Sequence, residues 1–527
     1  MGYMENPFKQ NDISRRHFLS ILGAGGLSFI LGGCQPQSLP FKSIRFLEKA
    51  KQSFPFMGLA TSLPEEYRYE AWVEGKLPVN LLGTLYRNGP GLFDRGGYRK
   101  RALLDGDGMI QAFSFHGTGV RFQNKFVRTK KYVEESAAGK FLYPSWSTQA
   151  PGGVWANFWA FGKMIGQASI SVIFWRRKLF AFDESSLPYE LNPETLETVG
   201  PTNLGVPDKN VLFAGHYKLD EHNGDWLHFG LEYGRKVTLH LIVFSKNGKI
   251  KRYRKMTLPR YVYMHDFLVS ERYLIFILHP VEMAIAGFLL GQKSMAECLH
   301  WRPQSGNLVM ILNRENDANP VLINTDASFM WHGINAHEQG GEIIVDFVGY
   351  ENPDHFIGPN PLVFAVMTGE KGEAHFKGEI RRYVIDPEKN KLRQEIVGSG
   401  GYEWPFINPI HRCHPYRVGY LAKAAEGEFF WSIIAKVDMQ TGRMESYDFG
   451  QGLYCGEPVF VPEPGMGYQH EDSKEPGWLL TEVYNSHTNK SFLAILRADQ
   501  VADGPLAQVH LSHHVPFSLH GYWHSQI

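Results

Sequence analysis

The chain has 527 residues, of which 43% are hydrophobic and 20% charged, and its 54 basic residues balance its 54 acidic residues. This composition excludes a disordered chain, and the zero net charge excludes a global basic field that would gather nucleic acid, so no nucleic-acid partner is expected. With 54 glycines and 30 prolines, it is typical of a globular protein rich in strands and turns. A small or apolar ligand is the expected partner.

The N-terminus has the features of an export signal. Arg15 and Arg16 precede an uncharged run from Ser20 to Gly33, and Cys34 follows. The run is too short to span a bilayer, but it fits the apolar region of a signal peptide, and paired arginines before it are typical of the bacterial twin-arginine signal. The last residues of the run resemble a lipobox, in which the cysteine becomes lipidated. An ordinary N-terminal helix is the alternative.

These features predict the domain organisation. Residues 1–34 are expected to be a twin-arginine, lipoprotein-type signal segment, residues 35–50 a linker, and residues 51–527 a single folded domain. The protein is therefore predicted to be exported to the periplasmic side of a bacterial membrane and held there by a lipid anchor. The other three cysteines are too scattered for a disulfide framework and are expected to be core thiols; they are Cys298, Cys413 and Cys455.

From about Leu81 onward the chain consists of short apolar runs bounded by turn residues. Each run has strand length and alternating or β-branched apolar residues, as in Glu342–Val348, and turns such as the one within residues 219–226 predict hairpins. Helical patterns are rare, and the clearest cover Val281–Leu299 and the residues from Glu66 to Val73. No Pro- or Ser-rich linker divides the body, so we predict one large antiparallel all-β unit.

A propeller is the all-β architecture that best suits this length, because a ring of four-stranded blades reaches it easily. The sequence contains no repeated blade motif of the Trp-Asp type. The pattern alone therefore favours a propeller without establishing one.

Four histidines lie beside bulky apolar residues at predicted strand edges; they are His216, His265, His332 and His520. An unpartnered imidazole is costly to bury in such a place, so each needs a partner. Taken singly, each is expected to be a core histidine bonded to a backbone carbonyl. Ligands supplied from separate strands have no short spacing that would identify a metal site.

Several further motifs follow one another along the chain; they are Leu85–Gly91, Leu104–Ile110, Asn124–Thr129, Pro188–Gly200 and Gly456–Gly465. Together with the segments around the four histidines, they resemble the carotenoid cleavage oxygenase family. That family includes dioxygenases that cleave carotenoids, apocarotenoids and stilbenoids, and also the retinoid isomerase. The resemblance covers nearly the whole chain after the signal segment.

The resemblance implies a seven-bladed β-propeller with a helical cap over an axial iron site. It implies that the catalytic Fe(II) is bound by four ligands, His216, His265, His332 and His520. Neutral imidazoles leave two of six octahedral positions open for dioxygen or substrate. The family also supplies glutamates that accept the outer N–H of three of the histidines, and the matching positions are Glu184, Glu403 and Glu457. The sequence around Glu184 departs from the commonest family pattern.

The implied function is that of a non-haem Fe(II) dioxygenase. Such an enzyme would use O2 to cleave a C=C double bond of a conjugated apolar substrate, a carotenoid or apocarotenoid, into two carbonyl products. The 36 Phe, 24 Tyr and 12 Trp residues could furnish the walls of its pocket. The alternatives are a stilbenoid-cleaving dioxygenase, a non-cleaving isomerase that uses iron as a Lewis acid, and a binding propeller without turnover.

Two positions bear on the substrate. Lys131 lies near the place where stilbenoid-cleaving members have a lysine that binds a phenolic oxygen, although Lys130 and Lys131 could equally be a solvated pair. Arg101–Leu104 stands where the family often has a His-Trp-Phe-type stretch. That stretch borders the substrate tunnel in relatives, so the departure lies where the resemblance places the substrate.

Overall fold

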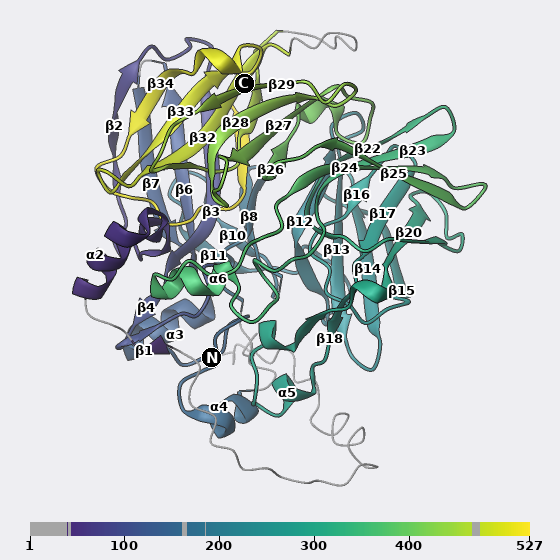
Figure 1. Cartoon of the computed structure of the whole chain (residues 1–527), viewed down its shortest axis with the longest axis horizontal. Helices are drawn as coiled ribbons and strands as arrows, with labels where there is room; N and C mark the ends of the chain where they lie inside the picture. Colours follow the sequence, from purple (N-terminus) through teal and green to yellow (C-terminus); the bar gives the residue numbers. More distant parts are fainter. Residues whose placement is uncertain are drawn as a thin grey trace, which may run out of the picture.

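The computed structural model describes residues 39–40, 44–117, 119–160, 166–184, 186–465 and 475–526. Strands make up most of these residues, and the strands within each sheet pair antiparallel. Five of the sheets have four strands each, and they follow one another along the chain from blue through teal to green in Figure 1. The predicted all-β class is confirmed.

The five four-stranded sheets are built mainly from successive hairpins. The first contains β8 (Ser171–Trp175), β9 (Lys178–Phe182), β10 (Tyr189–Leu191) and β11 (Thr198–Pro201). The second contains β12 (Leu212–Asp220), β13 (Asp225–Tyr233), β14 (Val237–Phe244) and β15 (Ile250–Thr257). The third contains β16 (Leu268–Val269), β17 (Tyr273–Leu278), β20 (Asn307–Asn313) and β21 (Val321–Thr325). The fourth contains β22 (Phe329–Gln339), β23 (Glu342–Tyr350), β24 (Glu379–Asp386) and β25 (Lys391–Gly398). The fifth contains β26 (Tyr402–Phe406), β27 (Val418–Ala424), β28 (Trp431–Asp438) and β29 (Met444–Asp448).

A ten-stranded sheet joins the two ends of the described chain. Its early strands are β2 (Arg68–Gly75), β3 (Gly83–Leu92), β6 (Asp107–His116) and β7 (Gly119–Phe126). Its late strands are β30 (Leu453–Cys455), β31 (Val459–Pro462), β32 (Gly477–Asn485), β33 (Lys490–Arg497), β34 (Pro505–His510) and β35 (Gly521–Ser525). The strand β2 links the two groups, because its first half pairs with β7 and its second half with β34. The strand β35 pairs with β3.

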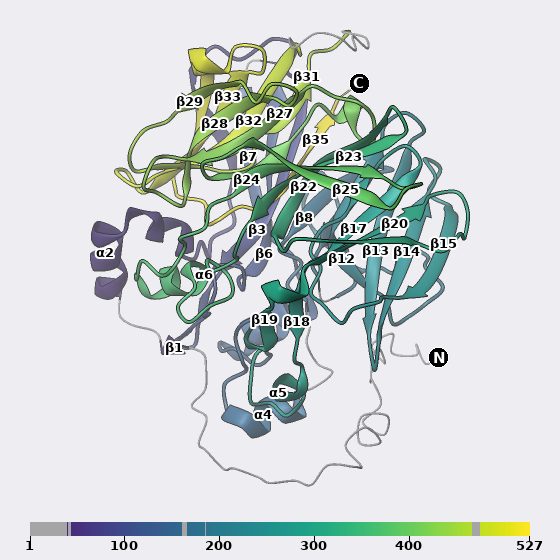
Figure 2. The same cartoon turned by 45° about the vertical axis from the view of Figure 1, so that its right-hand side comes forward.

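Short helices and strands lie at one end of the sheets, the lower end in Figures 1 and 2. The α-helices are α2 (Ile44–Ser53), α3 (Lys130–Ala138), α4 (Gly153–Trp159), α5 (Ala286–Leu289) and α6 (Leu362–Ala365). The short strands are β1 (Leu39–Pro40), β4 (Asp94–Arg95), β5 (Tyr98–Arg99), β18 (Val281–Met283) and β19 (Leu299–Trp301). Short 3-10 turns are distributed along the chain: η1 (Pro55–Ala60), η2 (Ala296–Cys298), η3 (Pro303–Ser305), η4 (Val366–Thr368), η5 (Pro409–His411) and η6 (Val501–Asp503).

The hydrophobic core is divided into clusters that lie between successive sheets. One cluster joins β13 and β14 to β17 and β20, and the next joins β17 and β20 to β23 and β24. Another packs the early strands of the ten-stranded sheet, through residues such as Phe113 and Phe122, against its late strands, through residues such as Leu480 and Ile495. Sheets that pack face to face around a centre in this way form a propeller-like fold.

Two predicted helices are wrong. The residues around Glu66–Val73 form strand β2, whose Tyr69, Ala71 and Val73 pack on the core with the two-residue period of a strand. Pairing with β7 and β34 therefore outweighs the helical pattern of that segment. The segment Val281–Leu299 contains one turn of α-helix, α5, and the 3-10 turn η2, because β18 precedes α5 and Gly291, with a φ of 70°, ends it.

The predicted signal segment and Cys34 lie outside the described residues, and the domain boundaries stay a prediction. Helix α2 begins within the expected linker, and its Leu47 and Ala50 are buried in the core. The folded body therefore includes part of the segment that was expected to be a linker. Among the described residues, no helix combines the length and the apolar character needed to cross a membrane.

Candidate metal centre

Each of the four predicted ligand histidines lies on, or just before, an edge strand. His216 is on β12 and His332 on β22, whereas His265 precedes β16 and His520 precedes β35. The pairing register shifts between Phe213 and Tyr217 on β12, and again around His332 on β22. Such irregularities free the backbone from the ladder and re-aim side chains. The imidazoles therefore point away from the sheets toward a shared centre.

The structure brings these four side chains together. Their ligand atoms all lie within 4.8 Å of one another, and three of the residues are buried while His520 is partly buried. The Nε2 atoms of His216 and His265 are 3.0 Å apart. Ring centroids of neighbouring histidines are separated by 4.5 to 5.4 Å. Four imidazole nitrogens at these separations form a donor set suited to one transition-metal ion.

The three glutamates at the positions that the resemblance indicated lie against the outer nitrogens of three of these histidines. His332 Nδ1 lies 2.8 Å from Glu403 Oε1, and His520 Nδ1 lies 2.8 Å from Glu457 Oε1. Glu184 accepts in the same way from His265. Because each Nδ1–H is donated to a carboxylate, the Nε2 lone pair is left for a metal.

Burial also favours the neutral form of the ligands. It lowers the pKa of His216 and of His332 well below the usual value, and the neighbouring imidazoles lower both further. A neutral imidazole presents its lone pair without first losing a proton, so these two ligands are ready to bind a cation at neutral pH.

The glutamates are themselves held by further groups. Tyr350 donates its hydroxyl to Glu403, and the N–H of Trp404 donates to the same carboxylate at 3.2 Å. Burial nevertheless raises the pKa of Glu403 to about 8. The Tyr263 hydroxyl lies 2.9 Å from Glu184 Oε2. A cation bound at the histidines would favour the ionised carboxylates.

Arg87 and Asn88, in the first of the sequence motifs, fix the segment that carries His520. The buried guanidinium of Arg87 donates to the carbonyls of Glu457 at 3.1 Å and Leu519 at 2.9 Å. The N–H of Asn88 donates to the His520 carbonyl at 3.0 Å, and Asn88 accepts from Leu519 N–H at 2.8 Å. The motif therefore acts on the metal centre through the backbone, a role that its residue types did not reveal.

Aromatic side chains pack directly against the histidines. The Trp331 ring lies 4.8 Å from that of His265, and Trp404 lies 5.1 Å from His332 and 5.3 Å from His520. Phe356 follows, 4.5 Å from Trp331, and Trp146 stacks on Phe356 at 5.2 Å. These rings would give an apolar substrate a wall close to the metal.

Most of the chain matches one protein family. The family model described as RPE65, retinal pigment epithelial membrane protein, matches residues 60–525. The chain belongs to this family. The predicted resemblance to the carotenoid cleavage oxygenases is thereby confirmed, because the family's relatives include apocarotenoid and carotenoid oxygenases.

Individual family members match the chain nearly end to end. Apocarotenoid-15,15'-oxygenase of Synechocystis sp. is 32% identical over 479 residues, which cover 88% of this chain and 94% of that protein. Lignostilbene-alpha,beta-dioxygenase isozyme III of Sphingomonas paucimobilis is 26% identical over 481 residues, which cover 86% of this chain and 92% of that protein. The crystal structure of cobalt-substituted Synechocystis apocarotenoid oxygenase has a TM-score of 0.83 and 30% identity, covering 90% of this chain and 99% of that one.

A cavity of about 130 Å³ opens on three of the four family histidines, His216, His332 and His520. Polar side chains also line it, among them Lys218, Asp266, Asn335, Arg412 and Tyr522. None of the aromatic residues packed against the histidines belongs to this lining. Apolar side chains such as Leu268, Ile334 and Phe406 line the rest of it, so the metal centre has a cavity of mixed polarity in addition to its aromatic surroundings.

Lys131, the predicted substrate contact, lies in a buried ionic cluster. Helix α3 is capped by Thr129, which accepts from Tyr132 N–H, and this places Lys131 on the inner face of the helix. Its Nζ lies 2.7 Å from Asp107 Oδ1 and 3.0 Å from Glu135 Oε2, and the side chain is fully buried. The expectation of a solvated pair is therefore wrong for this residue. Its contact with a substrate oxygen stays a prediction that this geometry does not support.

A second group of metal-ligand residue types contains Asp208, Glu232 and His240. The ammonium of Lys255 lies between its carboxylates, with Nζ 2.5 Å from Asp208 and 3.6 Å from Glu232. This cation already offsets one of the two negative charges and contacts both carboxylates. We therefore interpret the group as an ion-pair cluster of the second sheet.

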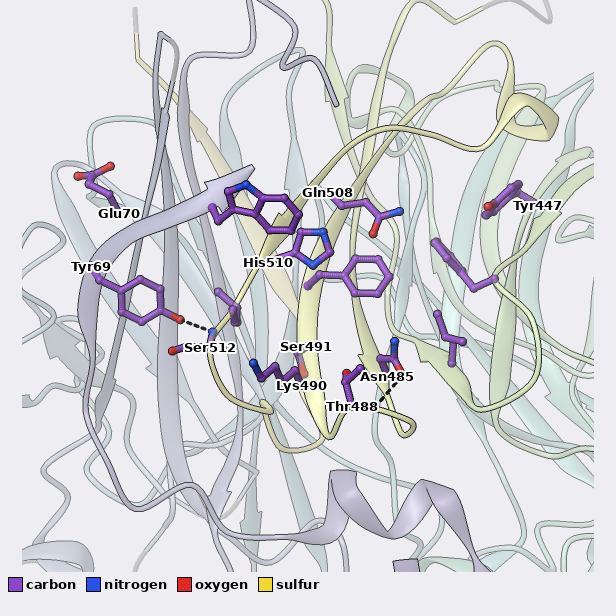
Figure 3. Close-up of a pocket in the computed structure, with 15 residues that line it drawn as sticks. Tyr69, Glu70, Tyr447, Asn485, Thr488, Lys490, Ser491, Gln508, His510 and Ser512 are labelled. Atoms are coloured by element: carbon purple, nitrogen blue, oxygen red, sulfur yellow. Dashed lines mark hydrogen bonds between the residues drawn. The ribbon is translucent and has the colours of Figure 1, made fainter. Parts of the chain in front are cut away.

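A groove of about 790 Å³ is lined by residues of β2, β33 and β34, together with Tyr447 and Phe449 (Figure 3). Trp72 stacks on His510 there with ring centroids 4.5 Å apart, and the Tyr69 hydroxyl accepts from Ser512 N–H at 3.2 Å. None of the four ligand histidines lines this groove. It is separate from the metal centre.

Proposed function

We propose that the protein is a non-haem Fe(II) dioxygenase that uses O2 to cleave a C=C double bond of a carotenoid or apocarotenoid into two carbonyl products. The observation that carries this proposal is the convergence of four imidazoles, three of them held by glutamates, in a chain that is 32% identical to an apocarotenoid oxygenase. Neutral nitrogen donors of this kind suit Fe(II).

The histidines, the glutamates and the aromatic residues of the site would have different roles in the reaction. When bound, iron would supply O2 activation at the coordination positions that the four ligands leave open. The glutamates fix the tautomer and ring angle of three ligands, so that their Nε2 lone pairs stay directed inward. Trp331 and Phe356 would position the conjugated chain of the substrate beside the metal and keep bulk water away from it.

We infer that the fold is a seven-bladed propeller in which the ten-stranded sheet counts as two blades. Support comes from the core cluster that packs its early strands face to face against its late strands, as the other clusters pack neighbouring sheets. We also infer that the helices form a cap over the metal centre. The contact chain from Trp146, before α4, through Phe356 and Trp331 to His265 supports this.

Iron analysis combined with an O2-dependent assay tests the proposed function. The purified protein should bind one Fe(II) per chain and convert an apocarotenoid into two carbonyl products, each labelled when ¹⁸O₂ is supplied. Iron content well below one per chain that does not respond to His265→Ala or His332→Ala would falsify the metal assignment.

A stilbenoid substrate is the second candidate, favoured by the similarity to lignostilbene dioxygenase isozyme III. Product masses from one incubation with mixed apocarotenoids and stilbenes separate the two candidates. An anaerobic incubation separates cleavage from isomerisation, because isomerisation alone persists without O2. Iron binding without consumption of O2 or isomerisation would indicate a binding propeller.

We further propose that the protein is exported and lipid-anchored on the periplasmic side of a bacterial membrane. The support lies in the sequence around Arg15, Arg16 and Cys34. Cell fractionation tests this proposal. Cys34→Ser should move the protein from the membrane fraction to the soluble fraction, and Arg15→Lys with Arg16→Lys should retain it in the cytoplasm.

A further inference from the structure

One buried carboxylate, that of Asp266, binds groups from several segments at the metal centre. Its side chain is 1% exposed. Oδ1 accepts from the N–H of Phe267 at 2.8 Å, and Oδ2 accepts from the N–H of Gly333 at 2.9 Å. The ammonium of Lys218 lies 2.9 Å from Oδ1 and 3.0 Å from Oδ2. Both carboxylate oxygens are therefore fully used.

The partners of Asp266 come from the segments that carry three of the four histidines. Asp266 itself follows His265, and Gly333 follows His332 on β22. Lys218 lies two residues after His216 on β12. Since β12, the segment before β16, and β22 belong to three different sheets, no backbone ladder joins them. The hydrogen bonds and ion pair of Asp266 join them instead.

His216 is the one ligand without a glutamate on its outer nitrogen. Its Nδ1 faces Asp266, with Oδ1 at 3.9 Å, which is too long for a direct hydrogen bond but close enough for electrostatic attraction. Among the described residues, Asp266 is thus the carboxylate that lies within ion-pair distance of His216.

We propose that Asp266 is a positioning residue of the metal centre, which holds the His216, His265 and His332 segments at the spacing one metal ion requires. This inference rests on the proposed function, because it presumes that the histidines bind a metal. The carboxylate is suited to the task, since it accepts hydrogen bonds at both oxygens. An amide could accept at only one end and would turn its NH₂ toward a donor at the other.

The test uses Co²⁺ as the probe, since the Synechocystis relative has been solved in a cobalt-substituted form. We expect Asp266→Asn to weaken Co²⁺ binding by about 10- to 100-fold and to shift the absorption bands of bound Co²⁺. The matched control is Asp346→Asn. Asp346 is equally buried, and its hydrogen bonds among the described residues go to Arg382, at 2.7 Å, and Tyr416, at 2.7 Å, and not to the four ligands.

A purely structural role would lower the stability of both variants and leave Co²⁺ affinity and spectrum unchanged. If Asp266→Asn does not fold, Lys218→Met is the variant that tests the proposal. The Lys218 side chain reaches solvent, and its loss removes the ion pair between the His216 segment and the Asp266 carboxylate. Weaker Co²⁺ binding by Lys218→Met then supports the proposal, and unchanged binding overturns it.

The two proposals fail in different ways. A wild-type protein that binds neither Co²⁺ nor Fe²⁺ overturns the proposed function and this inference together. If the wild type binds metal and Asp266→Asn matches it in affinity and spectrum, only the role of Asp266 is overturned. The same conclusion follows if Asp346→Asn loses as much affinity as Asp266→Asn.

Discussion

Glu403 Oε1 lies 2.8 Å from Nδ1 of His332, and the two residues come from neighbouring sheets, on β26 and β22. The hydrogen bond therefore orients a metal ligand and joins two parts of the propeller-like fold at the same time. Tyr350, on β23, donates to the other oxygen of Glu403. A substitution at Glu403 should consequently affect metal binding before it affects other properties of the protein.

Replacing Glu403 with alanine should weaken metal binding by about 10- to 100-fold, because His332 would lose the group that fixes its tautomer and ring angle. Competition titration with a coloured chelator measures the affinity. The control is Glu338→Gln on the same strand as His332, where Glu338 accepts from Arg272 at 2.9 Å and lies outside the metal centre. Equal affinities for the two variants would contradict the role of Glu403.

Removing the metal should destabilise the folded protein. A ligand that binds only the folded state adds about 4 kcal/mol when its free concentration is a thousand times its Kd. Urea unfolding with and without added Fe²⁺ should show a midpoint that rises with metal concentration. His332→Ala should abolish this rise, and a rise that persists in this variant would place the metal elsewhere.

Lys131→Met should reduce the free energy of unfolding by about 3–5 kcal/mol, because it leaves the two buried carboxylates of Asp107 and Glu135 with Arg95 as their one shared cation. Lys130→Met is the matched control, since Lys130 is exposed and its Nζ lies 3.9 Å from Glu134. Denaturant unfolding compares the two. A Lys131→Met protein of normal stability that has lost only phenolic substrates would instead favour the substrate contact.

Acid should destabilise the protein from about pH 6.5 downward through its buried neutral histidines. Burial lowers the pKa of His228 from 6.5 to about 4, so between these values only the unfolded chain takes up the proton. The stability that His228 contributes is present above pH 6.5 and is lost as the pH falls toward 4.

His228→Phe isolates this effect, because His228 lies between the rings of Phe182 and Phe213, at 5.0 and 5.2 Å. The variant loses the hydrogen bond to the Phe229 carbonyl, so it should be less stable at pH 7. Between pH 6 and pH 5, the free energy of unfolding should fall less steeply for the variant than for the wild type. The difference between the two slopes should be about 1.4 kcal/mol per pH unit. Parallel pH profiles would show that His228 is not the titrating group.

The all-β class and the hairpins could be predicted because they depend on local patterns, such as the alternation in Glu342–Val348 that becomes β23. The strand that replaces the helix expected around Glu66–Val73 could not be predicted from sequence, because pairing with β7 and β34 determines the conformation of that segment. These partners lie far away along the chain. The local preference of a segment for helix or strand is outweighed where it makes many contacts with distant strands.

The metal ligands could be predicted only through the family resemblance, because His216 and His520 have no spacing that links them. The contacts of Asp266 and Arg87 could not be predicted at all. An acidic residue just before an apolar run, as Asp266 is, is typical of an ordinary turn. Its partners Lys218 and Gly333 become its neighbours only when three sheets pack together. The burial of Lys131 could not be predicted for a related reason, because it depends on Asp107 from strand β6.

The pairing of β35 with β3 has a consequence for biosynthesis. His520 immediately precedes β35, whereas His216, His265 and His332 leave the ribosome much earlier. A nascent chain thus holds three imidazoles before the fourth exists, and the strand that delivers the fourth must dock beside one of the first strands made. Metal that reached the nascent chain would meet an incomplete, open set of ligands. Correct metallation should therefore follow release of the chain, and any metal captured earlier would have to be exchanged.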